Sequence, residues 1–161
     1  MKISEAGKRL IVQLEGIQST VYHDSAGLPT IGVGHLLTRS ELSSGKIIVS
    51  GMMRIRYKDG ITYDQAMGLL SQDLMRFEAV VNEGIYSKLT QHQFDALVSF
   101  SFNIGDMAFM CSTLRKRVND SGDLDSVPAQ MRRWVYAGGK TVEGLKNRRE
   151  MEIVMWEGRE T

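Results

Sequence analysis

Residues 15–35 read Glu15-Gly-Ile-Gln-Ser-Thr-Val-Tyr-His-Asp24-Ser-Ala-Gly-Leu-Pro-Thr30-Ile-Gly-Val-Gly-His35, so two carboxylates, a hydroxyl and a glycine-rich turn lie in one short segment. Cleavage of a glycosidic bond needs such groups. One acid protonates the departing sugar oxygen, and a second, ionised carboxylate stabilises positive charge at the anomeric carbon or activates water. If Glu15 ends a helix and Asp24 and Thr30 lie on a hairpin that follows, all three side chains can face one cleft. The segment therefore predicts a carbohydrate-cleaving enzyme.

A glycine-rich phosphate-binding loop is the alternative interpretation of the end of this segment. Residues 31–35 alternate apolar side chains with glycine, which lets a backbone approach another group closely. The third glycine of a dinucleotide-binding fingerprint is missing, however, and no Gly-Lys-Ser/Thr follows. The sequence does not support a phosphate-binding loop here.

The secondary structure expected for the N-terminal part changes from helix to strand. Apolar residues recur at helical spacing in the first 17 residues, with Ser4 as the expected N-cap and Gly16 as a left-handed C-cap. Residues 19–35 combine Thr, Val and Tyr with turn residues, which is typical of short strands. Residues 37–60 are expected to be irregular, apart from a short helix after Thr38.

The rest of the chain is predicted to be helical. The capping box Thr62-Tyr-Asp-Gln65 opens a long helix that we expect to reach residue 82. A second capping box, Thr90-Gln-His-Gln93, opens another helix. Further helices are expected at 112–119, 127–136 and 143–157. The fold class is therefore α+β and mostly helical.

Length and composition fit a single domain covering residues 1–161, with 42% hydrophobic and 24% charged residues. The one cysteine, Cys111, excludes an internal disulfide and is expected to be a small buried hydrophobe. No apolar run approaches the roughly 20 residues of a transmembrane helix, and the N-terminus lacks the apolar core of a signal peptide. We therefore expect synthesis in the cytoplasm. A monomer is expected because no exposed apolar stripe is evident.

The net charge is only +1, but positive charge gathers between residues 115 and 149, where nine Lys and Arg face four acids. Such a patch could meet nucleic acid, anionic lipid or an acidic wall polymer, or it could be an ordinary solvated face. The three histidines have no metal-ligand spacing, so no metal site and no cofactor are predicted.

The spacing of Glu15, Asp24 and Thr30, followed by Ile-Gly-Val-Gly-His, resembles the signature of phage-type lysozymes (glycoside hydrolase family 24, phage endolysins). The resemblance covers nearly the whole chain, in the family's usual order. It includes His35-Leu36-Leu37-Thr38, Gln72-Asp73, Phe102-Asn103-Ile-Gly105, Ser112-Thr113-Leu114-Arg115, Arg133-Trp134 and Asn147-Arg148.

The resemblance implies a two-lobed lysozyme-like fold. A small β-hairpin N-terminal lobe, about 15–61, and a helical C-terminal lobe, 83–161 plus the first helix, would be bridged by the helix at 62–82. It also implies muramidase activity, which is cleavage of the β-1,4 bond between N-acetylmuramic acid and N-acetylglucosamine in peptidoglycan, without a cofactor. The family is of the inverting kind, which needs the two carboxyl groups roughly 6.5–9.5 Å apart to leave room for water.

By the same resemblance, Glu15 is the general acid, Asp24 the assisting carboxylate and Thr30 the hydroxyl that helps to hold the attacking water. A general acid must stay protonated near neutral pH, so we expect the surroundings of Glu15 to desolvate it more than those of Asp24. Arg148 matches a family arginine close to the acid and would position it. His35 and Asp73 match a structural pair.

Four residues would line the cleft by resemblance, namely Leu36, Phe102, Ser112 and Thr113. Leu36 and Phe102 would offer sugar rings an apolar face, and one of the two hydroxyls would bond a polar sugar group. Which hydroxyl does so is left open by the sequence.

The resemblance further implies release of the enzyme from the host cytoplasm by a holin, lysis of the host of a phage or prophage, and no stable membrane association. Two alternative functions are left open by the sequence. A lytic transglycosylase breaks the same bond without water, and a non-catalytic wall-binding protein could keep the fold. Nucleic-acid binding through the basic patch would show a steep salt dependence, and no helix-turn-helix pattern supports it.

Overall fold

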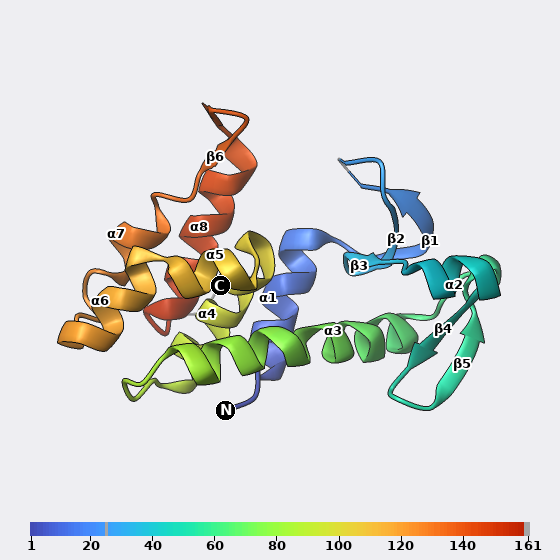
Figure 1. Ribbon diagram of the computed structural model, residues 1–161, viewed down its shortest axis with the longest axis horizontal. Coiled ribbons are helices and arrows are strands. Elements are labelled where there is room, and N and C mark those ends of the chain that lie inside the picture. Colours follow the sequence, from blue (N-terminus) through green and yellow to red (C-terminus); the bar gives the residue numbers. More distant parts are fainter. Residues whose placement is uncertain (25, 160–161) are drawn as a thin grey trace. The chain divides into compact units, whose positions relative to one another are not determined.

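The structure is a computed structural model that describes residues 1–24 and 26–159. Helices dominate, with three small antiparallel sheets (Figure 1). The chain folds as two compact units, one of Ile11–Met75 and the other of Met1–Leu10 with the residues from Arg76 onward. Helices α1 (Glu5–Glu15) and α3 (Tyr63–Gly84) each begin in one unit and end in the other. This α+β architecture agrees with the predicted fold class.

The unit of Ile11–Met75 contains the two sheets of the N-terminal part of the chain. Its elements are β1 (Gln18–His23), β2 (Pro29–Gly32), β3 (His35–Leu36), α2 (Arg39–Ser44), β4 (Lys46–Val49), β5 (Met53–Arg56) and the 3-10 turn η1 (Tyr57–Asp59). Strand β2 lies between β1 and β3, and Thr30 pairs with Tyr22 on one side and Leu36 on the other.

A buried apolar cluster supports both sheets of this unit. It includes Ile31 of β2, Ile47 and Val49 of β4, and Leu69 of α3. The outward residues of β4, Lys46 and Ile48, alternate with the buried ones, as the two-residue period of a strand requires. The hairpin β4–β5 lies next to α2 (Figure 1).

The other unit is built around α4 (Gln91–Ile104), whose residues 94–101 are all buried, as expected for a helix surrounded by protein. It packs against α8 (Glu143–Trp156). The remaining elements are α5 (Asp106–Cys111), α6 (Thr113–Ser121), α7 (Val127–Met131), β6 (Tyr136–Ala137) and β7 (Lys140–Thr141).

Several helix ends follow the predicted capping residues. Thr62 and Thr90 form the two predicted capping boxes, and the Ser4 hydroxyl accepts a hydrogen bond from the Gly7 amide. Thr38 forms a third capping box, at the start of the short helix expected after it. Gly16, at φ 75°, ends α1 in the left-handed conformation, and its amide donates to the Val12 carbonyl at 2.8 Å.

Three expectations about the secondary structure and burial were wrong. The short helix expected after Thr38 is present as α2, but the rest of residues 37–60 is not irregular and holds the β4–β5 hairpin and η1. The helix expected at 127–136 ends at Met131, because the chain turns at residues 132–133 and then forms the β6–β7 hairpin around two glycines. Cys111 is exposed rather than buried, since it ends the short helix α5, in which only Phe109 is buried.

Candidate active site

Glu15 is the last residue of α1, and its side chain is exposed. Asp24, by contrast, is half-buried. The expectation that Glu15 would be the more desolvated of the two carboxyl groups is therefore wrong for the free protein. The physical reason is the position of Glu15 in the final turn of the helix, where Gly16 redirects the chain and leaves the carboxyl group outside the apolar core.

The Asp24 carboxylate is fixed by the turn that follows it. Its Oδ1 accepts hydrogen bonds from the amides of Ala26 at 2.9 Å and Leu28 at 2.8 Å. The backbone closes the same turn, because the Asp24 amide donates to the Leu28 carbonyl at 3.0 Å. Among the described residues, no group donates a hydrogen bond to Oδ2, so this oxygen can meet water or a substrate.

Thr30 lies on the central strand β2 and is only 2% exposed. Its Oγ1 donates to the Leu28 carbonyl at 2.9 Å. The hydroxyl hydrogen is thereby used within the turn, and the oxygen lone pairs stay available to accept a hydrogen bond from a water molecule.

Tyr22 connects these groups. The pKa of its phenol is raised above 10.0, first by burial and then by the negative charges of Glu15 and Asp24. Tyr22 also pairs with Thr30 across the β1–β2 ladder. The charges of both candidate carboxylates therefore act on the Tyr22 phenol, and Thr30 is its neighbour across the ladder.

Tyr22 was not singled out from the sequence, because its relation to Thr30 arises only from the pairing of β1 with β2.

His35 bridges two acids in the same unit. Its Nδ1 contacts both carboxylate oxygens of Asp73, at 2.9 and 3.1 Å, and its Nε2 lies 3.3 Å from Glu41. Burial alone would lower the pKa of His35, but hydrogen bonds and charge from Asp73 and Glu41 outweigh it and raise the pKa above 6.5. The structure thus brings the expected pair together and adds Glu41, which no sequence pattern singles out.

The residues predicted to contact sugar differ in their exposure to solvent. Leu36 of β3 is 49% exposed. Phe102 of α4 is half-buried and packs edge-on against Phe77, with ring centroids 5.3 Å apart. Ser112 is 4% exposed and caps α6, because its Oγ accepts from the Arg115 amide at 3.1 Å, whereas Thr113 is exposed. Thr113 is therefore the more accessible of the two hydroxyls.

Arg148 belongs to a buried polar network on α8. Its Nε donates to Glu152 at 3.2 Å, and Glu152 also accepts hydrogen bonds from Ser99 at 2.9 Å and from Arg149 at 2.7 Å. The guanidinium of Arg149 packs over the Phe100 ring and donates to Asn103. This network restricts the Arg148 side chain to few orientations.

Within residues 1–24 and 26–159, no group of three or more His, Cys, Asp or Glu side chains is arranged to hold a metal ion. In the same residues, none of the helices combines the length and apolar character that crossing a bilayer requires.

The family model for phage lysozyme matches residues 12–152, which is most of the chain. The protein belongs to the phage lysozyme family. An endolysin of Acyrthosiphon pisum secondary endosymbiont phage 1 is 37% identical, with 98% of this chain and 99% of the relative aligned. This confirms the family resemblance deduced from the motif.

Solved structures agree with this assignment. The endolysin from Escherichia coli O157:H7 phage FAHEc1 superposes with a TM-score of 0.79 at 37% identity, covering 97% of this chain and 93% of that one. The muramidase domain of SpmX from Asticaccaulis excentricus gives 0.77 at 33% identity, covering 96% and 97%. The chain therefore has a lysozyme fold and is a peptidoglycan hydrolase of the phage lysozyme type.

Proposed function

We propose that this phage lysozyme is an inverting muramidase that cleaves the β-1,4 bond between N-acetylmuramic acid and N-acetylglucosamine, with Glu15 as the general acid. The observation that carries the proposal is the turn after β1, in which Leu28 connects the Asp24 carboxylate to the Thr30 hydroxyl, while Glu15 ends the helix that precedes this strand. Two carboxyl groups and a hydroxyl held near one another are the groups that inverting hydrolysis uses.

Asp24 and Thr30 would act on the water molecule. Because Oδ1 of Asp24 is held by two amides, its carboxylate plane is fixed before substrate binds, and Oδ2 is the oxygen left to accept a proton from water. The Thr30 hydroxyl donates to Leu28, so it would accept the other hydrogen of that water. Both groups draw electron density toward the oxygen that attacks the anomeric carbon.

Protonation of Glu15 would depend on the substrate. The side chain is exposed in the free protein, so burial in its own fold does not supply the desolvation that favours the neutral acid. A sugar bound over the carboxyl group would exclude water from it and favour the protonated form. We therefore propose that substrate binding supplies the desolvation that a general acid needs.

Leu36 and Phe102 would give the glycan apolar contacts, and Thr113 rather than Ser112 would supply the hydroxyl contact, because Ser112 is used as a helix cap. Arg148 would act as a positioning group for Glu15, with its orientation fixed by Glu152. By family resemblance, we also propose that the enzyme acts as a monomer and reaches the wall through a holin.

The test is digestion of purified Gram-negative peptidoglycan by wild type, Glu15→Gln, Asp24→Asn and Thr30→Ala, followed by mass spectrometry of the fragments. We expect hydrated muramic acid reducing ends from wild type, loss of activity in Glu15→Gln, and strong reductions in the other two variants. Glu5→Gln is the matched control, because it removes an exposed carboxylate from the opposite end of the same helix.

Three results would argue against the proposal. Normal hydrolysis by a folded Glu15→Gln variant would exclude the assigned acid. Fragments with 1,6-anhydro-muramic ends would identify a lytic transglycosylase. Absence of fragments from wild type, combined with retention on walls, would identify a non-catalytic wall-binding protein.

A further inference from the structure

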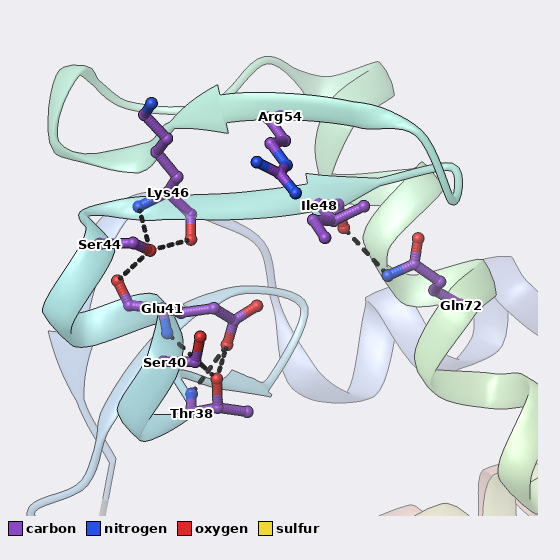
Figure 2. Close-up of a pocket in the computed structure, with 8 residues that line it drawn as sticks. All are labelled: Thr38, Ser40, Glu41, Ser44, Lys46, Ile48, Arg54 and Gln72. Atoms are coloured by element: carbon purple, nitrogen blue, oxygen red, sulfur yellow. Dashed lines mark hydrogen bonds between the residues drawn. The ribbon is translucent and has the colours of Figure 1, made fainter.

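A pocket of about 440 Å³ lies on the outer side of the β4–β5 hairpin, within the unit of Ile11–Met75 (Figure 2). Its lining combines Lys46 and Arg54, the apolar Ile48, and polar side chains from α2 and α3, including Glu41 and Gln72. The volume falls in the range of small-ligand sites, roughly 300–1,000 Å³. The proposed catalytic chemistry uses none of these residues.

The pocket wall is held in place by the α3 side chain Gln72. Its Nε2 donates to the Ile48 carbonyl at 3.0 Å (Figure 2). Its Oε1 accepts from the Gly51 amide at 3.0 Å. Ile48 is paired with Arg54 across the ladder, so both side chains stand on the same outward face. The side-chain amide of Gln72 therefore ties the hairpin to α3 through both its nitrogen and its oxygen, and the pocket is formed before any ligand arrives.

The charge of the pocket is unbalanced. Among residues 1–24 and 26–159, neither Lys46 nor Arg54 has an ion-pair partner. The pocket's acid, Glu41, is already used, because it accepts hydrogen bonds from the amide and hydroxyl of Thr38, both at 2.8 Å, and contacts His35. Residues 42–58 hold four Lys and Arg and no acid. Two cations in a preformed pocket thus lack a counter-charge.

We propose that this pocket binds a free carboxylate of the peptide stems that peptidoglycan strands carry. The proposal rests on the proposed function, which supplies a substrate with such carboxylates. The Arg54 guanidinium presents paired N–H donors that match the two oxygens of a carboxylate, and Lys46 adds a second charge. Ile48 offers an apolar surface to the adjoining peptide. The Glu41 carboxylate at the rim favours a single small anion over a dense polyanion such as nucleic acid.

The first experiment measures binding without catalysis. A synthetic stem tetrapeptide with free carboxylates is titrated into the isotopically labelled protein, and the amide signals of residues 46–54 are followed by NMR. The same peptide with its carboxylates amidated is the ligand control, and inorganic phosphate is a third ligand. We expect shifts with the free peptide only, and about tenfold weaker binding in the Lys46→Gln, Arg54→Gln double variant. The Arg56→Gln, Lys58→Gln double variant removes equal charge from the same segment outside the pocket and should bind as wild type does.

The second experiment compares hydrolysis of peptide-bearing glycan strands with hydrolysis of strands stripped by an amidase. The pocket variant should lose about tenfold in kcat/KM on the peptide-bearing strands and match wild type on the stripped ones. Hydrolysis by wild type with no peptide-dependent shifts in residues 46–54 would overturn the peptide pocket and leave the muramidase proposal intact. Equal shifts with amidated peptide or with phosphate would also overturn it. Peptide-specific shifts without any hydrolysis would instead contradict the muramidase proposal.

Discussion

Asp73→Asn should destabilise the protein in slightly acidic solution and much less in alkaline solution. The change removes the charge opposite His35 while keeping the shape of the side chain. A hydrogen bond to a charged group contributes about 1.5–3 kcal/mol to folding. Because the Asp73 side chain is 26% exposed and that of His35 12% exposed, we expect a loss of about 2 kcal/mol after solvent screening. For a chain of this length, that corresponds to a fall in Tm of roughly 4–8 °C.

The sign of the pH dependence follows from the raised pKa of His35. The folded-state pKa lies above the unfolded value of 6.5, so folding favours proton uptake by this side chain. The stabilisation is fully present below pH 6.5 and is lost as the pH rises through the folded-state pKa. The penalty of Asp73→Asn should shrink over the same window, since neutral imidazole keeps only an ordinary hydrogen bond.

Urea unfolding of wild type and Asp73→Asn between about pH 5 and 9 measures this penalty, and NMR titration of the three histidines gives the pKa of His35 directly. Asp64→Asn is the matched control, because it removes an exposed acid from the same helix; it should change stability by less than about 0.5 kcal/mol at any pH. An equal penalty for Asp73→Asn at both ends of the range, or a His35 pKa at or below 6.5, would refute the reasoning.

Two further predictions concern the active site. The pKa of the Tyr22 phenol, measured by NMR titration, should lie closer to 10.0 in Glu15→Gln and in Asp24→Asn than in wild type, because each variant removes a negative charge that disfavours the phenolate. An unchanged pKa in both variants would show that neither acid influences the phenol. Ser112→Ala should lower the free energy of unfolding by about 1 kcal/mol through loss of the helix cap, whereas Thr113→Val should raise KM and leave stability nearly unchanged. The opposite pattern in unfolding and kinetic measurements would assign the substrate contact to Ser112.

The sequence predicts those parts of the fold that depend on neighbours a few residues away. The capping boxes at Thr62 and Thr90 involve only four residues each, and Gly16 needs only its own freedom to adopt positive φ. Glu15, Asp24 and Thr30 were singled out as candidates for a similar reason, since their spacing is a local pattern.

The parts that the sequence analysis missed depend on pairing between segments. Strand β4 places two apolar residues side by side at 47 and 48, so its alternation is concealed, and only the buried cluster reveals which of them faces inward. The turn after it was signalled by Ser50-Gly51, both at positive φ in the structure. Tyr22 and Glu41 join the site through tertiary contacts, which no spacing within a single element encodes.

The intervals between the motif residues are themselves structural requirements. Five residues separate Asp24 from Thr30. Among them, Leu28 is bonded by both the carboxylate and the amide of Asp24, and its carbonyl accepts the Thr30 hydroxyl. One more residue in this turn would shift the β1–β2 register and turn alternate side chains to the other face of the sheet. Thr30 would then lose its place opposite Tyr22. The spacing therefore carries more information than the residue types, because carboxylates and hydroxyls are common but few intervals let one residue, Leu28, bond both Asp24 and Thr30.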